Sequence, residues 1–108
     1  MMKTLSVMAV VLLIAACGEA PDATKAVKDD GAPDGAEIFD MYCTLCHGAD
    51  GTQGINGAKD LTKSLLSEEE MTAIVTNGRN TMAAYRQVLD AAQIDAVVDH
   101  VRSLKKSE

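Results

Sequence analysis

The segment Cys43-Thr44-Leu45-Cys46-His47 constrains this chain more than any other feature. The pattern C-x-x-C-H places two thiols three positions apart, with an imidazole directly after the second thiol. At a helix end, thiols at this spacing can each form a thioether with one vinyl group on the edge of a haem, and the imidazole then lies where it can bind the iron. The motif therefore predicts one covalent haem c on Cys43, Cys46 and His47.

Two other chemistries use similar residues. A thioredoxin-like C-x-x-C pair needs a βαβ context, and no segment of this chain alternates apolar and polar residues as a strand does. A zinc site would have to combine the motif with His100, but the adjacent Cys46 and His47 make a poor tetrahedral pair. Haem attachment therefore explains the spacing of Cys43, Cys46 and His47 better than a thioredoxin-like pair or a zinc site does.

The N-terminus has the features of a secretory signal peptide. Lys3 supplies a positive charge ahead of the apolar run Leu5–Ala16, which only Ser6 interrupts. A membrane-spanning helix needs about 20 apolar residues, so this run is too short to span. We therefore expect residues 1–16 to be a cleaved export signal.

The apolar run ends in Ile14-Ala15-Ala16-Cys17, which is similar to the lipobox of bacterial lipoproteins. In those proteins the cysteine receives a diacylglyceryl thioether, and cleavage just before it makes it the acylated N-terminus. We expect Cys17 to be the lipid attachment site and to anchor a periplasm-facing protein to a bacterial membrane. Gly18 after the cysteine favours the outer membrane over the inner one. The alternative is a plain signal peptide that leaves Cys17 as a free thiol.

Charge and cysteine count narrow the function further. The 108 residues carry a formal net charge of −6, which becomes −7 when Lys3 is lost with the signal peptide. Nucleic-acid binding needs a Lys- and Arg-rich surface, so we exclude it and expect a partner with a basic or mixed surface. Of the three cysteines, Cys17 would carry lipid and the other two haem, which leaves none for a structural disulfide.

The stretch after the lipobox differs in composition from the rest of the chain. From Gly18 to Pro33 it is rich in Ala, Asp, Lys and Gly and has no apolar periodicity. Such a composition is typical of a flexible linker. We therefore expect residues 17–33 to tether one domain over residues 34–108, with an ordered extension as the alternative.

The domain contains three capping pairs, in each of which a short polar residue precedes Glu or Gln by three positions. Apolar residues at helical spacing follow each pair, and the first predicted helix, Gly35–Leu45, runs into the cysteine motif. No segment alternates with period two, so we predict an all-α fold of about four short helices around one haem, with long loops and no sheet. The pairs and their apolar residues are Asp34 and Glu37 with Ile38, Met41, Tyr42 and Leu45; Ser67 and Glu70 with Met71, Ile74 and Val75; and Asp90 and Gln93 with Ile94, Val97, Val98, Val101 and Leu104.

The candidates for a second iron ligand, opposite His47, are Met82, Met71, Met41 and His100. Met41 and Met71 lie on predicted apolar helix faces, where methionine usually fills a core, and His100 adjoins the stripe of the last helix. Met82 instead lies in a loop, from which a thioether can reach over a haem. A thioether ligand favours ferrous iron and suits an electron carrier, so we predict Met82 as the ligand.

These residues resemble the class I monohaem c-type cytochromes, including the small bacterial ones. The resemblance implies a small helical fold in which the first and last helices cross near Gly35 and Phe39, one haem c, and Met82 opposite His47. The segments that carry it are Gly35–Phe39, Cys43–Gly51, Asp60-Leu61, Ile74–Tyr85 and Gln93–Leu104.

The chain departs from the pattern of that family at three places. Ala83 stands where a proline usually follows the ligand methionine, which predicts a more mobile loop. No proline lies near Gly57-Ala58 to lend its carbonyl to the ligand histidine, so another carbonyl would have to orient His47. His100 occupies the place of an aromatic residue that packs on the first helix.

A haem iron with ligands on both faces has no open position for a substrate. We therefore expect a monomeric electron carrier, not an enzyme, that exchanges one electron with membrane-associated redox partners in the periplasm. The alternatives are a haem enzyme or gas sensor with an open sixth position, and a fixed electron-entry subunit of a larger oxidoreductase.

Overall fold

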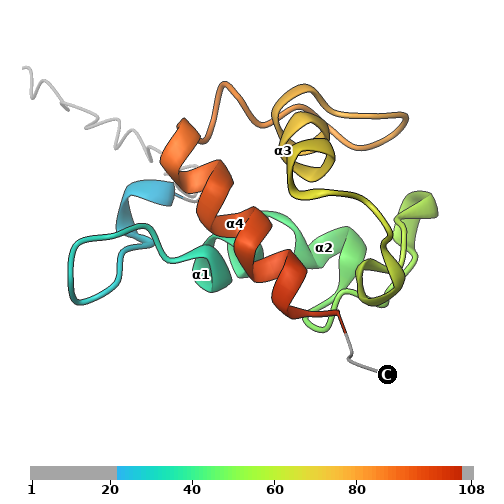
Figure 1. The fold of residues 1–108 in the computed structure, drawn as a ribbon, viewed down its shortest axis with the longest axis horizontal. Coiled ribbons are helices and arrows are strands. Elements are labelled where there is room, and N and C mark those ends of the chain that lie inside the picture. The colour runs from blue at the N-terminus through green and yellow to red at the C-terminus, as the bar shows by residue number, and fades with distance from the viewer. Residues whose placement is uncertain (1–21, 106–108) are drawn as a thin grey trace, which may run out of the picture.

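The computed structural model describes residues 22–105, which form short helices joined by long loops (Figure 1). Residues 22–105 contain two isolated β-bridges, Val27 with Pro33 and Arg79 with Met82, and no strand, so the predicted all-α fold is confirmed. No helix in this part of the chain is long and apolar enough to cross a membrane. In order, the elements are the 3-10 helix η1 (Ala23–Lys25), α1 (Gly35–Tyr42), α2 (Thr44–His47), the 3-10 helices η2 (Ile55–Gly57) and η3 (Leu61–Lys63), α3 (Glu68–Asn77) and α4 (Ala91–Ser103).

All three predicted helix caps are present. The Asp34 carboxylate accepts hydrogen bonds from the N–H groups of Ala36 and Glu37 at the start of α1. Complete capping boxes, in which each side chain bonds the other's backbone, begin α3 at Ser67 and α4 at Asp90. These bonds satisfy backbone donors that no helical carbonyl can reach. The helix starts are therefore set by local sequence.

The first predicted helix is interrupted at Cys43. Its backbone, at φ −109° and ψ −29°, ends α1 and begins the one-turn α2. The break changes the direction of the following side chains, so Leu45, predicted on the apolar face, is 81% exposed. Phe39 is buried instead. The position of Leu45 was therefore predicted wrongly, and the cysteine motif lies on a separate short helix.

Helices α1 and α4 cross at very close range (Figure 1). A Cβ atom built on Gly35 would lie 1.9 Å from the carbonyl oxygen of Ala96 in α4, so only glycine permits this approach. One turn further along α1, the Phe39 ring packs on the His100 ring with centroids 5.0 Å apart. The crossing near Gly35 and Phe39 that the family resemblance implied is confirmed.

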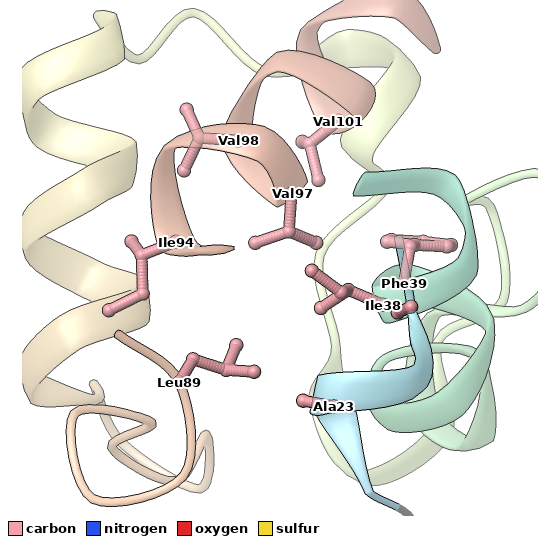
Figure 2. Close-up of a cluster of buried hydrophobic side chains, with 9 residues drawn as sticks. Ala23, Ile38, Phe39, Leu89, Ile94, Val97, Val98 and Val101 are labelled. Carbon is pink, nitrogen blue, oxygen red and sulfur yellow. The ribbon is translucent and has the colours of Figure 1, made fainter. Parts of the chain in front are cut away.

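A single hydrophobic core surrounds this crossing. Figure 2 shows Val97 of α4 beside Ile38 of α1, with Ala23 and Leu89 below them. The predicted stripe of α4 is buried except at Leu104, which is half-buried. The buried side chains are Ala23, Ala26, Ile38, Phe39, Leu89, Ile94, Val97, Val98 and Val101.

The segment that precedes α1 belongs to this core. Ala23 and Ala26 are 6% and 1% exposed, and the Gln93 amide of α4 donates a hydrogen bond to the Ala23 carbonyl at 3.1 Å. The predicted flexible tether is therefore wrong for residues 22–33, because small alanine side chains let this segment pack without the large apolar residues that a periodicity detects. The predicted signal peptide and Cys17 lie outside the described residues.

We predict that Gly35→Ala destabilises the fold by about 1–3 kcal/mol, because the helices must separate to accept the new methyl group. The gain in helix propensity, ~1 kcal/mol at most, does not offset this loss. The measurement is the free energy of unfolding from a denaturant titration. Gly54→Ala is the matched control, since its Cβ would meet only the Ala58 carbonyl oxygen, at 3.6 Å. Equal stability of the two variants would contradict the close crossing.

Candidate functional site

A cavity of about 580 Å³ opens beside the helix crossing. Its volume is within the range of pockets that enclose a small organic ligand. Cysteine-motif residues line one part of it, and the loop between α3 and α4 lines another. The main lining residues are Phe39, Tyr42, Cys43, Cys46, His47, Asn56, Lys59, Leu61, Met71, Ile74, Val75, Arg79, Thr81, Met82, Tyr85, Val97, Val98 and Val101.

The two cysteines of the motif reach this cavity from the junction of α1 and α2. Cys43 and Cys46 are both free thiols, with no disulfide between them. The Cys43 N–H donates to the Phe39 carbonyl at 2.9 Å, which ties the motif to the helix crossing. Burial, and the neighbouring Cys46, raise the pKa of the Cys43 thiol to about 12. In this apolar setting the Cys43 thiol stays neutral.

His47 is held by a backbone carbonyl of the opposite loop. Its Nδ1 lies 3.1 Å from the carbonyl oxygen of Lys59. A hydrogen bond from Nδ1 fixes the ring orientation and leaves Nε2 as the atom that can bind a metal. The expectation that a carbonyl other than a proline's orients His47 is thus met by Lys59. Residue type could not identify Lys59 as the partner, since every residue has a carbonyl.

Of the candidates for a second ligand, Met82 and Met71 line the cavity, whereas Met41 and His100 are not among its lining residues. Met71 shares its stripe with Ile74 and Val75 on α3. Met82 lies in a tight turn, in which it and Arg79 exchange two backbone hydrogen bonds of 2.9 and 3.1 Å.

The turn depends on Gly78, whose φ of +75° is left-handed. A Cβ atom on Gly78 would lie 2.6 Å from the Met82 carbonyl oxygen. The glycine that follows the last residue of α3 thus also makes room for the Met82 turn.

Tyr85 completes the wall of the cavity next to the motif. Its hydroxyl donates to the Tyr42 carbonyl at 3.3 Å, and the two rings meet edge to face with centroids 6.1 Å apart. Burial raises the pKa of the Tyr85 hydroxyl, with smaller contributions from Cys43 and Cys46. Sequence reasoning missed this contact, because a single tyrosine in a loop carries no periodicity.

The side chains around the cavity fit a covalently bound haem. Two thiols, an oriented imidazole and a thioether line one cavity, together with apolar side chains from α3 and α4. A zinc ion would need three or more clustered His, Cys, Asp or Glu side chains, and residues 22–105 contain no such cluster. His100, which the zinc alternative required, instead packs on Phe39.

Known proteins are similar to this chain over the same region. Residues 30–101 match the family model described as cytochrome c oxidase, cbb3-type, subunit III. This chain belongs to the c-type cytochrome family. A cytochrome c6 of Leptolyngbya boryana is 39% identical over 80 residues, which are 68% of this chain and 91% of that protein.

Solved structures of c-type cytochromes share the fold. The c-type cytochrome KustC0563 superposes with a TM-score of 0.63 at 26% identity and covers 68% of this chain and 99% of its own. Cytochrome c6C from Synechococcus sp. PCC 7002 superposes with a TM-score of 0.57 at 32% identity and covers 64% of this chain and 90% of its own. The fold and the single covalent haem c that the sequence predicted are therefore those of this family, and its cytochrome c6 members are small haem electron carriers.

Proposed function

We propose that this cytochrome carries single electrons on a haem c attached at Cys43 and Cys46, with its iron held between His47 and Met82. One observation carries the proposal: the three side chains of the cysteine motif and Met82, which lies 35 positions beyond His47, line the same cavity. A haem bound there supplies a one-electron couple between ferric and ferrous iron.

The residues around the cavity would set the reduction potential of that haem. The hydrogen bond from His47 to the Lys59 carbonyl makes the imidazole a stronger donor, and the Met82 thioether favours the ferrous state. Apolar side chains from α3 and α4 exclude water from the cavity and raise the cost of the extra charge on ferric iron. If His47 and Met82 both bind the iron, no open position would remain for a substrate, as expected of an electron carrier and not of an enzyme or gas sensor.

We also propose a location and a class of partner. Anchoring through Cys17, as the lipobox indicates, would hold the protein at the periplasmic face of a bacterial membrane, with the outer membrane favoured by Gly18. The negative net charge, −6 for the full chain and −7 without Lys3, favours encounter with redox partners whose docking surface is basic or mixed. Leu45, 81% exposed within the haem motif, offers such a partner an apolar contact.

We predict that Met82→Ala abolishes the methionine–iron charge-transfer band of the oxidised protein. The reduced variant should bind carbon monoxide at once, because its sixth position is open, whereas the reduced wild-type protein should show no carbon monoxide shift. Absorption spectra of the purified holoproteins provide both measurements.

Met71→Ala is the matched control, since Met71 lines the same cavity and the variant should keep the band. If Met71→Ala lost the band and Met82→Ala kept it, Met71 and not Met82 would be the iron ligand. Immediate carbon monoxide binding by the wild-type protein would support the enzyme or sensor alternative.

We predict that Cys43→Ala with Cys46→Ala removes covalent haem completely, because no thiol is left to form a thioether. On a denaturing gel stained for haem, the double variant should give no band, and each single variant should keep a weaker one.

Cys17→Ser is the matched control, because it changes the third cysteine of the chain. It should keep full haem staining and lose both the diacylglyceryl mass and membrane association. Mass spectrometry that finds an unmodified N-terminus in the wild-type protein would refute the anchor without touching the haem assignment.

A second candidate function is a fixed electron-entry subunit of a larger oxidoreductase. The observation that favours it is the family model, whose description names an oxidase subunit. Native electrophoresis of gently solubilised membranes distinguishes a free carrier from a fixed subunit. A free carrier should migrate near the size of its own mature chain, which is smaller than the 11.4 kDa of the full sequence, with haem and detergent added. A fixed subunit should migrate with a large complex.

A further inference from the structure

One side-chain hydrogen bond joins the loop that carries Met82 to the loop on the other side of the cavity. The Thr81 hydroxyl donates to the Asn56 carbonyl oxygen at 2.9 Å, across 25 positions of sequence. Both residues line the cavity. Asn56 has a left-handed backbone, at φ +55° within η2, which is tolerated by asparagine better than by most residues. The bond therefore bridges the cavity one residue from the proposed iron ligand.

The Met82 turn needs such a bridge because the bonds that close the turn are local. The turn that holds Met82 is closed by its hydrogen bonds with Arg79, and further along the chain the Tyr85 N–H donates to Val75. These bonds lie within the loop or join it to α3. Three residues beyond Met82, the Tyr85 hydroxyl also donates to the Tyr42 carbonyl of α1 at 3.3 Å. The Thr81 bond ties the residue next to Met82 to the loop that orients His47. Ala83 follows Met82, so no proline ring stiffens the backbone after the ligand.

The loop that accepts the Thr81 bond also holds the opposite ligand. Three residues after Asn56, the Lys59 carbonyl lies 3.1 Å from Nδ1 of His47. The segment from Asn56 to Lys59 therefore contacts the His47 side of the cavity through one carbonyl and the Met82 side through another. Movement of Thr81 away from Asn56 would free the Met82 turn while leaving the His47 contact in place.

We propose that the Thr81–Asn56 hydrogen bond is a clasp that keeps Met82 on the iron and substitutes for the absent proline. Thr81 is thus a positioning residue, and the inference rests on the proposed ligation by Met82. A net hydrogen bond of this kind shifts an equilibrium by roughly two- to tenfold. Loss of the clasp should raise the population of the opened loop, and hence the rate of ligand exchange, by about that factor.

The experiment measures how fast imidazole binds to the oxidised holoprotein, since Met82 must leave the iron before imidazole can enter. Thr81→Val removes the hydroxyl at nearly constant shape, and Thr81→Ser restores a hydroxyl. Thr76→Val is the matched control, because the Thr76 hydroxyl bonds only within its own helix, to the Thr72 carbonyl at 2.7 Å. The charge-transfer band and the unfolding midpoint are recorded for each protein.

We expect Thr81→Val to bind imidazole roughly two- to tenfold faster than wild type, with Thr81→Ser and Thr76→Val close to wild type. A wild-type band together with an unchanged rate in Thr81→Val would overturn the clasp alone. So would equal acceleration in Thr76→Val, which would show a general loss of stability. A wild-type protein without the band would refute Met82 ligation itself, and the clasp with it.

Discussion

The contact between Gly35 and Ala96 determines where everything else in this structure can lie. It allows α1 and α4 to cross with almost no space between their backbones, and Phe39 and His100 pack together one turn away. The end of α1 is thereby fixed against the core, and the cysteine motif begins at that end. A looser crossing would displace Cys43 and His47 relative to α4, whose valines form part of the cavity wall.

The core is incomplete around the cavity, and this explains why the chain needs its cofactor. No residue of α3 is buried. Its apolar side chains, Met71, Ile74 and Val75, instead line the cavity. A small domain buries a smaller fraction of its surface than a large one, and here a large apolar cofactor would supply the contacts that a second layer of side chains would otherwise provide. Haem attachment and folding of α3 are therefore expected to depend on each other.

Residue patterns predicted the local interactions, whereas the one long-range contact that was expected, the crossing of α1 and α4, came from the family resemblance. The caps at Asp34, Ser67 and Asp90 depend on residues three positions apart, and the structure has all of them. The contact of His47 with Lys59 and the bond of Thr81 to Asn56 involve a carbonyl, which every residue has, so no pattern of residue types marks the partner. For the same reason, sequence could place Met82 in a loop but could not show what holds that loop.

The N-terminal segment illustrates a different limit of sequence patterns, with a consequence for the proposed anchor. Hydrophobic periodicity detects large apolar side chains, and the segment that contains Ala23 and Ala26 has few of these, yet both alanines are buried against α4. The chain from Cys17 to Asp22 can extend at most about 18 Å. A lipid on Cys17 would therefore keep the core close to the membrane surface, where only a membrane-associated partner could reach the haem regularly. The short segment after Cys17 would then restrict this cytochrome to partners at the membrane, and the negative charge of the domain would favour those with a basic or mixed docking surface.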